Sequence, residues 1–174
     1  MSIHLSFKNL LPLFVTLLLV THNSCGQSPT SKEVYKAENE GWLVDMDEAY
    51  ALSKKTGKPI LANFTGSDWC GWCKRLTASV FSQEEFKSWA KKNVVLLELD
   101  FPRGKTLPEK IVQQNNSLQQ SFSVRGYPTI WVFDLGKNEK TKQYEINALG
   151  STGYRASVAE FTNDITPMLA KRVK

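Results

Sequence analysis

Four segments of the chain carry the apolar patterns of β-strands. Residues 59–64, 94–100 and 129–133 are short, mainly apolar runs bounded by turn-forming residues. Runs of this kind are typical of strands that are buried on both faces of a sheet. Residues 142–149 alternate polar and apolar positions more regularly. This alternation predicts an edge strand, or a strand with one exposed face.

Five further segments have the spacing of helices. We expect helices at residues 45–55, 70–80, 82–92, 106–122 and 154–170. Capping boxes that begin at Ser82 and Thr106 mark two of the starts, and Asp45 with an acidic residue three positions later marks a third. Pro167 is expected to bend or end the last helix. The order of elements predicts an α/β domain with a central mixed β-sheet and helices on both faces.

The N-terminal end has a different pattern from the rest of the chain. An apolar run spans residues 10–20, which is too short to cross a bilayer and fits the apolar region of a signal peptide. We therefore predict a signal peptide at residues 1–24, a flexible tether at residues 25–40 and a folded domain at residues 41–174. The tether is rich in Ser, Thr, Lys and Glu, a composition typical of a linker.

Cys25 stands directly after this apolar region and a small residue, Ser24. That arrangement resembles a bacterial lipoprotein signal, in which the cysteine becomes the lipidated first residue of the mature protein. His22 departs from the pattern, because the class usually has an aliphatic residue there. Cleavage without lipidation and an uncleaved anchor therefore stay open as alternatives.

The composition is that of an ordinary globular protein, and 174 residues suit one domain. The formal net charge is +5, but the lysines are scattered among acidic residues and form no basic block. The charge pattern therefore gives no sign of a nucleic-acid surface.

Cys70-Gly71-Trp72-Cys73 carries the chemistry that is easiest to interpret. Two cysteines at this spacing can face each other across one helical turn, so that the first attacks a disulfide and the second resolves the mixed species. A helix N-terminus at Cys70 would stabilise its thiolate. The chain has three cysteines, and lipidation of Cys25 would leave the pair as its only thiols.

A second motif, Gly126-Tyr127-Pro128-Thr129, precedes a predicted buried strand. Together with Trp69-Cys70-Gly71-Trp72-Cys73 and the order of elements, it resembles the thioredoxin-like superfamily over residues 41–170. The exported bacterial thioredoxin and disulfide-isomerase-like proteins are the most similar branch. The resemblance implies a thioredoxin fold, a cis Tyr127–Pro128 bond beside the cysteines, and thiol–disulfide oxidoreductase activity without a cofactor or a metal.

The resemblance also implies roles and partners. Cys70 is expected to be exposed and to attack first, and Cys73 to be more buried and to resolve the intermediate. The expected substrate-binding residues are Trp69, Gly71, Trp72, Tyr127 and Pro128. The implied substrates are cysteine-containing proteins of the cell envelope or periplasm, with a membrane protein as electron donor and membrane attachment through the N-terminal lipid.

Two departures leave the direction of the reaction open. Many thioredoxins have a buried Asp beneath the cysteines, but this chain has Asn63, so a water or Glu98 would have to take the proton. The Gly-Trp dipeptide between the cysteines tunes the redox potential, so reductase, isomerase and oxidant all stay open.

Functions other than redox catalysis also stay open. A redox-inert binding module, an inert structural disulfide and a copper(I) carrier are each compatible with two cysteines. A zinc site is disfavoured, because zinc normally takes four ligands and the only histidines, His4 and His22, lie in the signal region.

The mature N-terminus provides a direct test of the signal prediction. We expect the mature protein from a bacterial membrane fraction to begin at Cys25 and to carry lipid there, because the apolar run is too short to remain as an anchor. Mass spectrometry of the N-terminal peptide checks this. An unmodified Cys25 would rule out the lipid anchor.

Overall fold

The structure is a computed structural model that describes residues 35–172. The predicted signal peptide, the lipidation site at Cys25 and most of the predicted tether lie outside the described residues. Within residues 35–172, no helix has the length and apolar character needed to cross a membrane.

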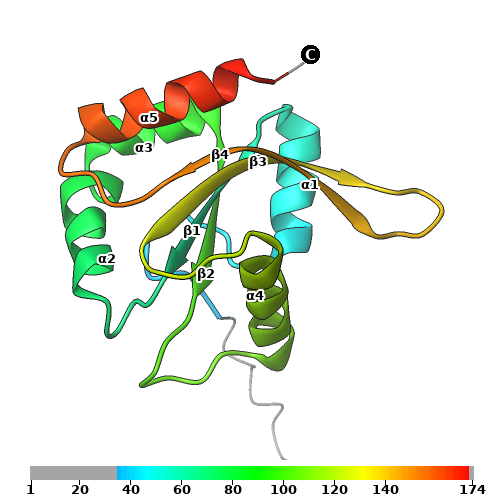
Figure 1. Cartoon of the computed structure of the whole chain (residues 1–174), viewed down its shortest axis with the longest axis horizontal. Helices are drawn as coiled ribbons and strands as arrows, with labels where there is room; N and C mark the ends of the chain where they lie inside the picture. The colour runs from blue at the N-terminus through cyan, green and yellow to red at the C-terminus, as the bar shows by residue number, and fades with distance from the viewer. Residues whose placement is uncertain (1–34, 173–174) are drawn as a thin grey trace, which may run out of the picture. The chain divides into compact units, whose positions relative to one another are not determined.

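The helices and strands follow the predicted order (Figure 1). In chain order they are α1 (Met46–Thr56), β1 (Ile60–Thr65), α2 (Gly71–Leu76), the π-helical turn η1 (Thr77–Phe81), α3 (Glu84–Asn93), β2 (Val95–Asp100), α4 (Glu109–Ser121), β3 (Thr129–Lys137), β4 (Tyr144–Thr152) and α5 (Val158–Ala170).

The four strands form one mixed sheet in the order β2-β1-β3-β4. β1 pairs in parallel with β2 and antiparallel with β3, and β3 pairs antiparallel with β4. The predicted mixed sheet is confirmed. The β3–β4 hairpin is longer than predicted, and its tip extends past the helices (Figure 1).

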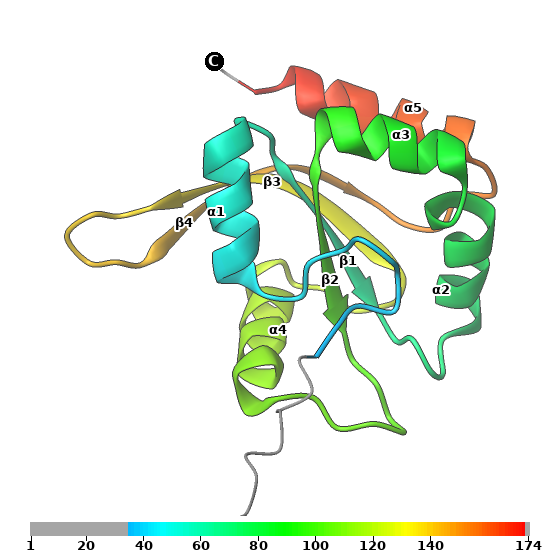
Figure 2. The same ribbon diagram turned by 180° about the vertical axis from the view of Figure 1, so that it is seen from behind.

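Helices cover both faces of this sheet, as predicted (Figures 1 and 2). Successive side chains of a strand point to opposite faces, so β1 contributes to two separate cores. Leu61 packs with residues of η1, α3 and α5. Ile60, Ala62 and Phe64 pack with residues of α1 and α4. Every residue of β1 is buried, which explains why its sequence reads as a continuous apolar run.

The helix starts were only partly predicted. Asp45 caps α1 as expected, and its carboxylate accepts hydrogen bonds from the N–H groups of Asp47 and Glu48. The predictions that capping boxes at Ser82 and Thr106 start helices are wrong. Ser82 instead ends η1, so α3 begins after Gln83, whose side chain makes no capping bond.

Proline accounts for the start of α4, and Pro167 leaves the end of α5 at the predicted residue. Pro108 occupies the cap position of α4, so the helix begins at Glu109 and not near Thr106. The fixed φ of proline suits a helix start. Pro167 does not end α5, which continues to Ala170. The carbonyl that loses its partner there belongs to Asn163, which is exposed and can bond water.

The folded part of the chain begins before Gly41, the predicted boundary. The buried carboxylate of Glu98 in β2 accepts hydrogen bonds from the N–H of Glu38 at 2.7 Å and from the N–H and Nδ2 of Asn39 at 3.2 and 2.6 Å. Leu43 then pairs with Leu97 at the edge of the sheet. The segment before α1 is therefore bonded to the outer strand β2.

Replacing Glu98 with glutamine tests this buried carboxylate. Burial raises the pKa of Glu98, although its N–H donors oppose the shift. The folded protein therefore holds the proton more tightly than the unfolded chain, and the stability linked to that proton is lost as pH rises through the raised pKa. We expect Glu98→Gln to be about 1–3 kcal/mol less stable at low pH, because its amide nitrogen would face N–H donors.

Urea denaturation measures the effect across pH. The free energy of unfolding of the wild type, relative to that of Glu98→Gln, should fall as the pH rises from the ordinary pKa of a glutamate through the raised pKa of Glu98. Glu85→Gln, at an exposed position of α3, is the control and should show a nearly constant difference. A constant difference for Glu98→Gln would contradict the expectation.

Candidate active site: a disulfide at a helix N-terminus

Cys70 and Cys73 form a disulfide at the start of α2, with an S–S distance of 2.10 Å and Cα atoms 5.3 Å apart. Cys70 is the N-cap residue, and its Sγ accepts a hydrogen bond from the N–H of Cys73 at 3.2 Å. The chain reaches this position from Thr65, the last residue of the central strand β1. After reduction, the same N–H and the helix dipole would stabilise a thiolate on Cys70.

Both cysteines are buried. Cys70 is 6% exposed and Cys73 is 4% exposed. The expectation that Cys70 would be exposed is therefore wrong for the disulfide form. A helix start that lies a short turn after a fully buried strand keeps the first sulfur close to the core. A substrate must therefore approach over the neighbouring side chains.

The segment before Cys70 is held by two carboxylates. Asp100, at the end of β2, accepts hydrogen bonds from the N–H and Oγ of Ser67 at 2.9 and 2.6 Å. Asp68 accepts bonds from the N–H groups of Gly104 and Arg103. These N–H groups hold the pKa of Asp68 below its usual range. The turn before the cysteines is thereby attached to the loop that follows β2.

Trp69 connects three parts of the site. Its Nε1 donates to the carbonyl of Phe101 at 2.8 Å, and its ring meets the ring of Tyr127 edge-on at 5.6 Å. The guanidinium of Arg103 lies 4.0 Å from the centre of the Trp69 ring. Trp69 is thus a half-buried anchor of the site.

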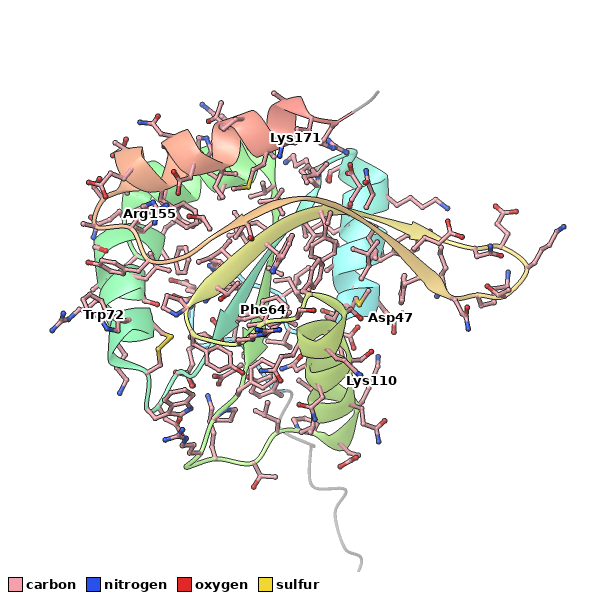
Figure 3. All side chains as sticks on the ribbon, viewed as in Figure 1. Asp47, Phe64, Trp72, Lys110, Arg155 and Lys171 are labelled. Atoms are coloured by element: carbon pink, nitrogen blue, oxygen red, sulfur yellow. A yellow bond between two sulfur atoms is a disulfide. The ribbon has the colours of Figure 1, made fainter. Side chains whose placement is uncertain are left out.

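Trp72, in contrast to the half-buried Trp69, is 54% exposed. It lies at the outer edge of α2, beside the yellow disulfide bond (Figure 3). Its ring is 4.9 Å from that of Tyr154, and the guanidinium of Arg75 lies 4.7 Å from it. Lys74 donates to the carbonyl of Asp68. Gly71 has open space where a side chain would begin.

The Tyr127–Pro128 bond is cis, as expected. Thr129 pairs with Phe64 in the antiparallel register, so Pro128 lies at the end of β1 that leads to the cysteines. The Tyr127 ring contacts the rings of Trp69 and Phe101, and its hydroxyl bonds Gln119. The fold therefore brings the second motif next to the first.

Asn63 lies on the same face of β1 as Leu61, the face that α5 and η1 cover. It is 2% exposed, and its Oδ1 has no hydrogen-bond partner among the described residues. Its register partner on β2 is Glu98. A buried amide and a buried carboxylate thus occupy neighbouring positions in the sheet.

Two features of the site were missed by sequence reasoning. Arg103 and Tyr154 are far from the cysteines in sequence, and no local pattern points to them. Arg75 lies three positions after Trp72, and that helical spacing was a usable signal for their contact. Over residues 35–172 there is no group of three or more His, Cys, Asp or Glu side chains that could hold a metal.

A disulfide at a helix N-terminus, next to a cis-proline loop on a mixed sheet, defines a thiol–disulfide oxidoreductase. The chain belongs to the thioredoxin-like domain family, whose model matches residues 46–145. The thioredoxin-like fold and the family resemblance expected from the two motifs are thereby confirmed.

Known proteins agree with this assignment. The chain is 34% identical over 128 residues to the disulfide bond reductase DsbH of Chlamydia pneumoniae, covering 70% of this chain and 76% of that one. A solved DsbH oxidoreductase structure superposes with a TM-score of 0.64 at 30% identity, covering 78% of this chain and 88% of that chain. A thioredoxin from Thermus thermophilus shares the fold, with a TM-score of 0.54 at 18% identity over 75% of this chain and 87% of that chain.

A longer relative matches over part of its length. The thiol:disulfide interchange protein DsbD of Colwellia psychrerythraea is 27% identical over 116 residues, which is 67% of this chain and 18% of that protein.

Gly66→Ala tests how firmly Trp69 is held. A Cβ at position 66 would lie 2.4–2.6 Å from three Trp69 ring atoms, and that ring is fixed by its bond to Phe101. We expect a loss of about 1–3 kcal/mol in the free energy of unfolding of the oxidised protein, measured with urea. Gly71→Ala is the matched control and should retain or gain up to about 1 kcal/mol, because its Cβ meets nothing within 4 Å. Equal stabilities would contradict the expectation.

Proposed function

We propose that this protein is an extracytoplasmic thiol–disulfide oxidoreductase that reduces or isomerises protein disulfides. The observation that carries the proposal is the Cys70–Cys73 disulfide at the N-terminus of α2, beside the cis bond that precedes Pro128. The similarity to a protein named disulfide bond reductase favours reduction over strong oxidation.

The proposed reaction has two exchange steps. The Cys70 thiolate attacks one sulfur of a substrate disulfide, which forms a mixed disulfide and releases the other substrate sulfur as a thiolate that takes up a proton. The Cys73 thiolate then attacks the Cys70 sulfur and releases the second substrate thiol. Two electrons pass to the substrate, and the enzyme is left with its Cys70–Cys73 disulfide. A second dithiol must reduce it before the next cycle.

The second step requires that Cys73 lose its proton. The amide of Asn63 cannot accept this proton, so Asn63 is not the base that deprotonates Cys73. Glu98 is the register partner of Asn63, and burial raises the pKa of its carboxyl group. Glu98 and a bound water are the two candidates for this role.

The substrate surface we propose consists of Trp69, Gly71, Trp72, Tyr127 and Pro128. Gly71 has open space where a side chain would begin and Trp72 is exposed, so a partner chain can approach over these two residues. The backbone around Tyr127, before the cis bond, would bind an extended substrate segment.

The proposed location rests on the N-terminal sequence. A signal peptide at residues 1–24, lipid on Cys25 and a tether that begins there would hold the domain at the surface of a membrane. Its substrates would be cysteine-containing envelope proteins. A membrane protein would supply electrons, and the relation to part of DsbD supports a place in such a chain of thiol exchanges.

Cys70→Ala tests the function. We expect the variant to lose the dithiol-dependent reduction of insulin, down to the uncatalysed rate, because the attacking sulfur is gone. Cys73→Ala is the matched variant and should form a stable mixed disulfide with substrate, since the resolving sulfur is missing. Undiminished activity in Cys70→Ala would overturn the proposal. Stoichiometric copper(I) binding by the wild type without any turnover would favour a copper carrier.

A further inference from the structure

Two arginines are stacked on the tryptophans that flank Cys70. The guanidinium of Arg103 lies 4.0 Å from the centre of the Trp69 ring, and that of Arg75 lies 4.7 Å from the Trp72 ring. Trp69 directly precedes Cys70, and Trp72 follows it by two positions. The two cationic groups come from different elements, the loop after β2 and the helix α2.

Neither arginine has an acidic partner among residues 35–172. The ion pairs of this part of the chain include Arg155 with Asp164, close to the site, but none with Arg75 or Arg103. The nearby carboxylate of Asp68 is used by backbone N–H groups. Exposed arginines usually gain little from a fixed position, so two that are held over aromatic rings without an acidic partner call for an explanation.

We infer that Arg75 and Arg103 bind carboxylate side chains of the substrate, so that the enzyme prefers protein disulfides with acidic residues next to the target cysteine. This inference rests on the proposed oxidoreductase function and adds a substrate class to it.

The chemistry of the pairs supports this role. Stacking restrains a guanidinium and leaves the N–H groups of its edge available for a carboxylate, with which arginine forms paired hydrogen bonds. An extended peptide advances about 3.3 Å per residue, so residues on either side of a bound cysteine can reach different side chains at the rim. Figure 3 shows Trp72 at the surface beside the disulfide, where such a peptide has access.

The charge around the site agrees with the same conclusion. Arg125, two positions before Tyr127, is also exposed and has no ion pair among the described residues. Arg125 therefore adds a third cationic side chain without an ion pair, in the loop that leads to the cis bond.

The test compares disulfide-linked peptides that differ only beside the cysteine. One has Asp and Glu flanking the cysteine, a second has Asn and Gln, and a third has Lys at both positions. We expect the wild type to reduce the acidic peptide with the highest kcat/KM. The ratio of kcat/KM for the acidic and the neutral peptide should fall about two- to fivefold in Arg75→Gln and in Arg103→Gln, and further in the double variant.

The ratio separates recognition from an effect on the thiol. Loss of an arginine can also change the pKa of Cys70, but that change affects the acidic and neutral peptides alike. Lys140→Gln removes the same charge at the exposed tip of the β3–β4 hairpin and should leave the ratio at its wild-type value. High salt should reduce the ratio in the wild type.

Three results would overturn the inference. The first is equal kcat/KM for the three peptides in the wild type. The second is an equal fall of the ratio in Lys140→Gln, which would indicate an effect of the protein's overall charge. The third is that the arginine variants lose activity only toward oxidised glutathione, a small disulfide with carboxylates. That result would assign the arginines to a small-molecule substrate. Reduction of the neutral peptide by the wild type would leave the proposed function intact in every case.

Discussion

The pairing of β1 with strands on both of its sides is the constraint on which the site depends. Phe64 pairs with Leu99 of β2 and with Thr129 of β3. The cysteines follow β1, the loop at Arg103 follows β2, and Pro128 precedes β3, so these two pairings bring three distant segments to one edge of the sheet. Because both faces of β1 are buried, a one-residue change in its register would exchange its side chains between the two cores and would also dismantle the site.

Polar groups then give this edge a fixed geometry. Asp100 and Asp68 bind backbone N–H groups on neighbouring loops, and Trp69 bonds to Phe101 and packs against Tyr127. The same contacts place the guanidinium of Arg103 over the Trp69 ring, next to the disulfide. The stability of the turn before Cys70 and the position of Arg103 thus have a common structural origin, since both depend on the loop after β2.

Much of the fold could be predicted from local pattern. The continuous apolar runs predicted strands, and Asp45 predicted a helix start, because the side chain that caps a helix is close to it in sequence. The errors at Ser82 and Thr106 arose where the same residue types had another use. Ser82 ends the preceding π turn, and Pro108 starts α4. The burial of Cys70 was also missed, because exposure depends on packing that the motif does not contain.

The sequence by itself determined the chemistry of this protein. It identified a dithiol and a likeness to thioredoxins, because both depend on short motifs, and that likeness implied the cis-proline partner. The tertiary structure decided which side chains surround the dithiol. Arg103 over Trp69, Tyr154 against Trp72, and Glu98 beside Asn63 each join residues that are more than thirty positions apart. Such contacts depend on strand register and loop packing, and a sequence motif cannot specify either of them.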